Sequence, residues 1–199
     1  MPKDTFFNLP EEKRNRIIDA AITIFSTIHY KKVTIDSIVN SAEIPKGSFY
    51  QYFENKDDLY KYIISGIGDR KKKALDQMEK MKEQLNFRDY VIQLLEEAEK
   101  FEKKDLKLVA LKDKFINECS QEIRKEVLKN EVPKSYKLLE EAITSYIEKG
   151  ELRKDLDVKT AAYMITSCVI GLEYYNFKKG QTIRDLMAEI LEVLVKGMK

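Results

Sequence analysis

Apolar side chains recur every three or four residues along most of the chain, which is the spacing of one face of an α-helix. No segment alternates apolar and polar residues over the length of a strand. Seven glycines and four prolines among 199 residues leave few points at which helices must end. We therefore predict an all-α fold. The clearest helical stripes lie in residues 17–28, 87–101, 108–119 and 136–147.

The most specific pattern lies in residues 34–60. Thr34 can cap a first short helix that has an apolar face. Residues 42–44 then form a tight turn, and Pro45 stands at a first helical position, where a missing N–H costs nothing. This arrangement is typical of a helix-turn-helix, a motif that places its second helix in the major groove of DNA.

The second helix, expected over residues 45–52, carries side chains that suit DNA. Lysine, serine, tyrosine and glutamine are residue types that hydrogen-bond phosphates and base edges. Ser48 and Gln51 are candidates for reading base edges, because a glutamine amide can pair bidentately with adenine. Phe49 and Phe53 are four residues apart and can both face inward. The segment is therefore predicted to be a recognition helix.

A third helix is expected to begin after Asn55, which can cap it. Its early apolar residues would pack on the first two helices. Beyond Gly68 the sequence turns polar, as in a connecting helix. We predict a DNA-binding domain over residues 1–68 and a larger helical domain for ligand binding and dimerisation over residues 69–199.

Residues 10–60, about a quarter of the chain, resemble the DNA-binding domain of the TetR family of bacterial transcriptional regulators. The resemblance rests on Phe25, Tyr30, Thr34, Ile38, Ala42, Lys46, Gly47, Phe49, Tyr50, Tyr52, Phe53, Asn55, Lys56 and Leu59.

Two positions depart from the family pattern, since His29 and Glu43 stand where the family usually has glycine. Glycine is common at such positions because it tolerates a positive φ. Histidine tolerates the left-handed region better than most residues, whereas glutamate has no such tolerance. The turn geometry at Glu43 is therefore the sharper departure.

The resemblance also implies roles for the matching residues around the recognition helix. It implies contact of Thr34 with the DNA backbone and close approach to the groove at Lys46 and Gly47. It further implies phosphate contacts by two tyrosines and a lysine. Packing is the alternative for Tyr52, and a solvated helix cap is the alternative for the lysines. The candidate DNA-binding residues are Thr34, Lys46, Gly47, Ser48, Tyr50, Gln51, Tyr52 and Lys56.

Charge alone would not have predicted a DNA-binding protein. The chain has a formal net charge of +2, and residues 1–60 hold eight Lys and Arg against nine Asp and Glu. Many of these acidic residues fall in first turns of predicted helices, where they offset the helix dipole. The lysines gather around the turn and the recognition helix, so we expect a local basic patch and an affinity that falls with salt. These lysines are Lys31, Lys32, Lys46 and Lys56.

The two C-terminal helices are candidates for a subunit interface. Residues 158–176 are almost free of charge, and residues 182–198 form an amphipathic pattern. Helix-turn-helix proteins normally bind near-palindromic sites as dimers, and two such helices from each subunit would form a four-helix interface. The TetR resemblance implies the same homodimer. The alternative is that both helices complete a monomer core. The candidate interface residues are Ile170, Gly171, Leu186, Ile190, Val193 and Leu194.

The resemblance further implies that the second domain binds a small inducer in a pocket among its helices, which changes the spacing of the two recognition helices. Tyrosine offers an apolar body with a polar tip, which suits a small apolar or aromatic effector. Any one of these aromatics can instead be ordinary core. The pocket candidates are Tyr90, Phe101, Phe115, Tyr136, Tyr146, Tyr163, Tyr174 and Phe177.

Other classes of protein fit the sequence poorly. The single histidine, His29, lies inside the DNA-binding motif, and no glycine-rich phosphate loop follows a strand. We expect no enzymatic activity, no catalytic residues, no metal and no cofactor. No apolar run approaches the roughly 18 residues that cross a bilayer. The first residues lack a signal-peptide pattern, so Cys119 and Cys168 are expected as reduced thiols in a cytoplasmic protein.

The leading hypothesis is a homodimeric, ligand-responsive transcriptional repressor. One alternative is a DNA-binding activator or constitutive regulator whose second domain only dimerises. Another is a helical ligand-binding or partner-binding protein whose helix-turn-helix no longer binds DNA. The near-neutral charge of residues 1–60 keeps this last alternative open.

Overall fold

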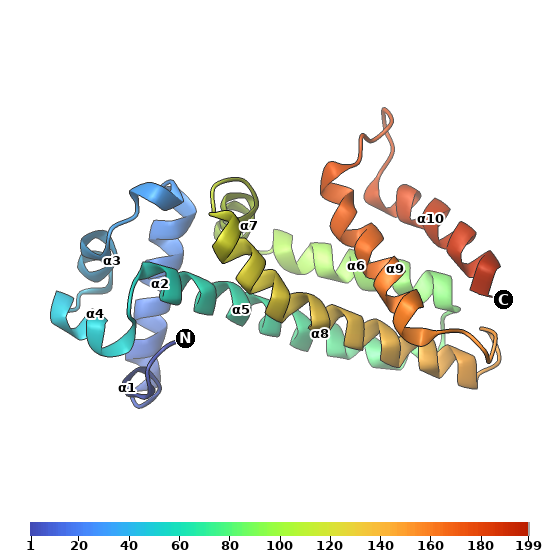
Figure 1. The fold of residues 1–199 in the computed structure, drawn as a ribbon, viewed down its shortest axis with the longest axis horizontal. Helices are drawn as coiled ribbons and strands as arrows, with labels where there is room; N and C mark the ends of the chain where they lie inside the picture. Colours follow the sequence, from blue (N-terminus) through green and yellow to red (C-terminus); the bar gives the residue numbers. More distant parts are fainter. Residues whose placement is uncertain (199) are drawn as a thin grey trace. The chain divides into compact units, whose positions relative to one another are not determined.

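The computed structural model describes residues 1–198, and within this range it is built from helices without strands (Figure 1). The predicted all-α fold is thereby confirmed. The chain forms two compact units, which we describe separately. The N-terminal unit comprises residues 1–72 and 101–130, and the C-terminal unit comprises residues 73–100 and 131–199. None of the helices in the described range is both long enough and apolar enough to cross a bilayer.

The N-terminal unit contains the predicted helix-turn-helix. In order, its elements are α1 (Asp4–Phe7), α2 (Glu11–Thr27), η1 (Tyr30–Lys32), α3 (Ile35–Ala42), α4 (Lys46–Tyr52), the first part of α5 (Lys56–Leu75), α7 (Leu106–Asn117) and the first part of α8 (Gln121–Glu148). Helix α2 packs against α3 and α7, while α4 packs against α1 and α3. A single apolar core runs through all of them.

The C-terminal unit has its own core. Its elements are the end of α5, η2 (Asp76–Glu83), most of α6 (Phe87–Lys103), the rest of α8, α9 (Val158–Gly171), η3 (Leu172–Tyr174) and α10 (Ile183–Met198). Tyr146 is fully buried at its centre, where its ring meets that of Phe87. The Tyr146 hydroxyl donates to the carbonyl oxygen of Leu85 at 2.8 Å, which satisfies its polar tip.

The division into units does not follow one cut in the sequence. Helix α7 and the start of α8 join the N-terminal unit, because Leu111, Phe115 and Val127 are buried in the same core cluster as Phe25 and Tyr60. Their apolar stripe was visible in the sequence, but the stripe does not say which core it enters. The boundary between residues 68 and 69 stays a prediction about functional domains.

The caps expected around the helix-turn-helix are present. The Thr34 hydroxyl accepts from the backbone N–H of Ser37 at 3.1 Å, and the Ser37 hydroxyl accepts from the N–H of Thr34 at 3.2 Å. This reciprocal pair satisfies two N–H groups that a helix start otherwise leaves without partners. Asn55 caps α5 in the same way, since its side-chain oxygen accepts from the N–H of Asp58 at 2.9 Å.

The two positions where glycine was expected behave differently. Glu43 ends α3 in the left-handed conformation, with φ 53° and ψ 48°, and the N–H of Ile44 then donates to Val39 at 3.1 Å. The positive φ that was expected at Glu43 is therefore confirmed. At His29 the same expectation is wrong, because His29 has φ −56° and ψ 131°. Any residue can adopt that backbone conformation.

Replacing Glu43 with glycine is expected to stabilise the protein by about 1 kcal/mol, because glycine lacks the Cβ that makes the left-handed conformation costly. The measurement is urea unfolding followed by far-UV circular dichroism. Glu43→Ala is the matched control, since it removes the carboxylate and keeps the Cβ. Equal stability of the glycine and alanine variants would contradict the prediction.

Candidate nucleic-acid interface

Helix α4 has an inward aromatic face and an outward polar face. Phe49 and Phe53 are fully buried, with ring centroids 5.5 Å apart, as their spacing predicted. The outward face carries exposed Lys46, Gly47, Tyr50 and Gln51, with Ser48 partly exposed beside them. The helix begins at Lys46 with Pro45 as its N-cap, one residue later than expected.

Tyr50 on α4 and Thr34 at the start of α3 both carry exposed hydroxyl groups. The Tyr50 side chain is 46% exposed. Thr34 is exposed at the start of α3, and its capping bond uses the hydroxyl oxygen only as an acceptor. Its O–H can still donate to an outside group, and a DNA phosphate is one acceptor of that kind.

Lys46 is paired with an acid from the preceding helix. Its ammonium lies 2.8 Å from Asp36 Oδ1 and 2.9 Å from Oδ2, and both side chains are largely exposed. The hydrogen bond to Asp36, and then the charge of that carboxylate, raise the pKa of Lys46. Asp36 is therefore the acidic partner of the Lys46 ammonium in this structure. Asp36 lies in the first turn of α3, and the sequence did not predict its pairing with Lys46.

Tyr52 and Lys56 are placed differently from the other candidates. Tyr52 is 5% exposed and its ring lies 6.2 Å from that of Phe6, so the packing alternative describes its side chain. The Lys56 ammonium donates to the carbonyl oxygens of Tyr30 and Val33, at 2.9 Å each. It also lies 4.8 Å from the centre of the Tyr30 ring. Direct phosphate contact by either side chain stays a prediction.

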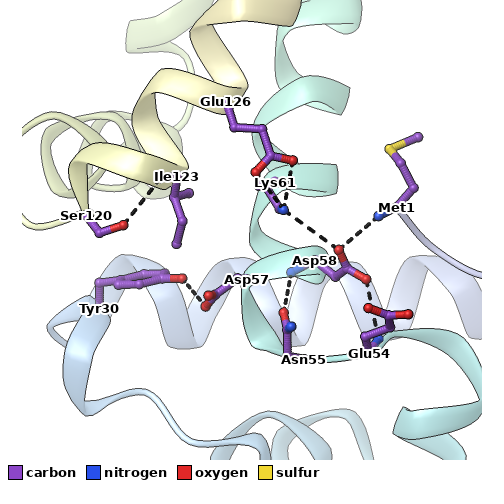
Figure 2. A network of polar contacts seen from close by, with 10 residues as sticks. All are labelled: Met1, Tyr30, Glu54, Asn55, Asp57, Asp58, Lys61, Ser120, Ile123 and Glu126. Atoms are coloured by element: carbon purple, nitrogen blue, oxygen red, sulfur yellow. Dashed lines mark hydrogen bonds and ion pairs between the residues drawn. The ribbon is translucent and has the colours of Figure 1, made fainter.

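A polar network fixes the start of α5 inside the N-terminal unit (Figure 2). The Tyr30 hydroxyl donates to Asp57, and burial, followed by this hydrogen bond, raises the pKa of Tyr30. Asp58 accepts from the Met1 ammonium at 2.9 Å. Lys61 donates to Glu126 of α8 at 3.0 Å, so these contacts join α5 to residues 101–130 of the same unit.

Glu118, at the end of α7, is a further contact that the sequence did not reveal. Its carboxylate accepts from the backbone N–H of Tyr30 and from Lys114, at 3.0 Å each. Burial acts to raise the pKa of Glu118, but the bonds from Lys114 and Tyr30 outweigh it and lower the pKa. The ionised carboxylate thereby holds η1, and through it the approach to α3, against α7.

The segment before α2 also contributes to this region and was missed. Phe6 is fully buried, with its ring 4.8 Å from that of Phe53. Two adjacent aromatics, Phe6 and Phe7, just ahead of Pro10 were the available signal. A segment of this length is too short to show a helical periodicity, so no helix was predicted there.

The aromatic residues predicted for a ligand pocket do not gather in one place. Tyr90 and Tyr146 lie in the core of the C-terminal unit, with ring centroids 5.8 Å apart. Phe115 lies instead in the core of the N-terminal unit, and Phe101 also belongs to that unit. The remaining four are partly or largely exposed in the C-terminal unit: Tyr136 and Tyr163, with rings 5.9 Å apart, and Tyr174 and Phe177.

Two pockets of the C-terminal unit are lined by other residues. One of about 350 Å³ is lined by Arg153, Leu156, Asp157, Thr160, Ala161, Met164, Val193 and Leu194. Another of about 440 Å³ is lined by Asn86, Arg88, Glu151, Glu192, Val195 and Lys196. The predicted pocket of aromatics stays a prediction.

The candidate interface residues fall into three groups. Leu186 is buried in the chain's own core, as the monomer alternative expects for that residue. Ile170, Gly171 and Val193 are exposed, with Val193 at 73%. Ile190 and Leu194 are partly buried.

Comparison with known proteins identifies the N-terminal motif. Residues 17–63 match the model of the bacterial regulatory proteins of the TetR family. Over 191 residues the chain is 26% identical to the fatty acid metabolism regulator protein of Bacillus subtilis (strain 168), with 94% of this chain and 95% of the relative covered.

Solved structures of other proteins are similar to this chain over most or all of its length. A TetR family transcriptional regulator from Chloroflexus aurantiacus is 28% identical, with 100% of this chain and 98% of the other covered and a TM-score of 0.51. The transcriptional regulator FadR from Bacillus subtilis, solved in complex with stearoyl-CoA, is 19% identical and covers 93% of this chain and 99% of its own, with a TM-score of 0.62.

These relatives are regulators, and the exposed face of α4 carries the residue types expected of a DNA-reading helix. The chain belongs to the TetR family of bacterial regulatory proteins and is a transcriptional regulator with an N-terminal DNA-binding domain.

Proposed function

We propose that the chain is a homodimeric, ligand-responsive repressor that binds a near-palindromic operator through α4. The observation that carries this proposal is the two-sided build of α4. Phe49 and Phe53 anchor one side, while Lys46, Gly47, Tyr50 and Gln51 are exposed on the other. A helix with this division can enter a major groove without uncovering its core.

Each exposed residue of α4 has a role in this proposal. Gln51 and Ser48 read base edges, while Tyr50 and Thr34 bind phosphates. Apart from its chain neighbours and the backbone of its own helix, a Cβ placed on Gly47 would meet no atom within 4 Å, so the space beside it is open to a DNA backbone.

Lys46 exchanges partners when DNA binds. Asp36 holds its ammonium in the free protein. A phosphate replaces the carboxylate in the complex, because an ammonium binds either oxygen anion through the same charge-assisted hydrogen bond.

The proposed dimer uses the exposed apolar side chains of α9 and α10. Tyr163, Met164 and Ile170 on α9 and Val193 on α10 are each at least 41% exposed. A second copy would cover them and set two α4 helices against two half-sites of an operator. A regulator that binds chromosomal DNA would act in the bacterial cytoplasm, where the chromosome lies.

The proposed effector is a molecule with a long apolar part, and the C-terminal unit would bind it. Support comes from relatives, since one is a fatty acid metabolism regulator and another was solved with stearoyl-CoA. Long-chain acyl-CoA is therefore the first class to test. Effector and operator would bind different conformations, so each would weaken the other.

Gln51→Ala is expected to lower operator affinity by about 10- to 100-fold, which corresponds to the loss of a bidentate base contact. Affinity for random-sequence duplex should stay unchanged. The measurement is fluorescence anisotropy with duplexes from upstream of the chain's own coding region, extended to genome-wide selected sequences. Gln77→Ala, at an exposed glutamine of η2, is the matched control.

The same titration tests the dimer, because the bound stoichiometry should be two chains per operator. Wild-type protein that shows no preference for any selected sequence over random DNA would contradict the DNA-binding role.

Lys46→Gln and Lys56→Met separate phosphate contact from internal support. We expect Lys46→Gln to make the slope of log K against log salt shallower by about 1.8, because the dimer loses two phosphate contacts and each contributes about 0.9. Lys56→Met removes the predicted phosphate contact of Lys56 together with its hydrogen bonds to two carbonyls. It should make the slope shallower by a similar amount and also lower the free energy of unfolding by about 1 kcal/mol. An unchanged slope for Lys56→Met would limit Lys56 to internal support.

Stearoyl-CoA is expected to weaken operator binding by about 5- to 150-fold, the usual range of coupling between two ligands. Saturation at about 100 times the dissociation constant should also stabilise the protein by about 2.7 kcal/mol. Coenzyme A without the acyl chain is the control. An unchanged melting temperature and operator affinity with stearoyl-CoA would exclude this effector class.

A further inference from the structure

Helix α4 has no local cap at its C-terminus. It ends at Tyr52, and Phe53 continues as extended chain with φ −136° and ψ 151°. The N–H of Phe53 donates to Phe49, which closes the last helical bond. The carbonyl groups of Tyr50, Gln51 and Tyr52 therefore lack partners within the helix. Helices usually satisfy such groups with a glycine turn or with water.

Residues 3–7, which we call the N-terminal arm, supply these partners. The Lys3 ammonium donates to the carbonyl of Tyr50 at 2.9 Å. The Thr5 hydroxyl donates to the carbonyl of Gln51. The backbone N–H of Lys3 donates to the carbonyl of Tyr52 at 2.8 Å. Three consecutive free carbonyls thus meet three donors that lie more than 40 residues away in sequence.

Phe6 anchors the arm in this position. It is fully buried, and its ring lies within 6.2 Å of the rings of Tyr52, Phe53 and Tyr62. Complete burial of such a side chain contributes roughly 1.5–3 kcal/mol. The anchor is apolar and the capping groups are polar, so loss of one capping hydroxyl leaves the arm docked.

We propose that the N-terminal arm is a positioning element for the DNA-reading helix, an inference that rests on the proposed function of α4. The arm holds the last turn of α4, which carries Tyr50 and Gln51, in helical conformation. A frayed turn would move the Gln51 amide away from the base edges and leave Lys46 in place. The arm therefore sets sequence-specific affinity and has little effect on the charge attraction between Lys46 and phosphates.

Thr5→Val is the test, because valine keeps the shape of threonine and removes the hydroxyl. Operator affinity should fall about fivefold for each half-site, the factor that corresponds to one hydrogen bond of ordinary net strength. Affinity for random-sequence duplex should stay constant, and hydrogen exchange at the amides of residues 50–52 should accelerate. Thr5→Ser should restore both readouts, since serine supplies the hydroxyl.

The matched control is Thr144→Val, because the Thr144 hydroxyl also donates to a backbone carbonyl, that of Glu140 at 2.8 Å, but in the C-terminal unit. It should leave both readouts unchanged. Wild-type operator affinity in Thr5→Val with unchanged exchange would overturn the positioning role and leave the proposed function intact. Equal losses on operator and random DNA would also overturn it.

Failure of the proposed function looks different, since wild-type protein itself would then show no preferred sequence. The exchange measurement still decides on the arm in that case. Faster exchange at residues 50–52 in Thr5→Val supports the capping, and unchanged exchange overturns it.

Discussion

A helix of seven residues cannot hold itself together in water, and α4 is such a helix. Isolated helices need roughly 12–15 residues before they are even marginally stable. The N-terminal unit supplies what α4 lacks. Phe49 and Phe53 fix its inner face, and Asp36 and the N-terminal arm bind its two ends. The side chains of Tyr50 and Gln51 on the outer face are therefore free for other contacts, because neither has to stabilise the helix.

The sequence predicted the parts of this arrangement that depend on neighbours within a few residues. The Thr34 and Asn55 caps and the inward pair of phenylalanines follow from spacing alone, and all are found. Glu43 is a further local feature of this kind. The turn requires the left-handed conformation at this position, and Glu43 adopts it although it is not glycine.

What could not be predicted depends on distant partners. The Lys56 ammonium is bound by carbonyls 23 and 26 residues away, and Thr5 bonds a carbonyl 46 residues away. Phe115 lay on a clear helical stripe, yet periodicity does not show whether that stripe enters the N-terminal or the C-terminal core. The same limit explains why the eight pocket candidates are scattered. Aromatic content shows that a ligand could be accommodated, whereas the place of a cavity depends on how helices pack.

The pairing of Lys46 with Asp36 also bears on how the protein would search a chromosome. Attraction to arbitrary DNA depends on cations that release counterions from phosphates. A lysine already neutralised by a neighbouring carboxylate contributes less to that attraction. The regulator would then stay bound for a shorter time at each non-specific sequence. The Asp36 carboxylate would release Lys46 only where the exposed face of α4 matches the DNA site. Its search speed would thus depend partly on the Asp36 carboxylate.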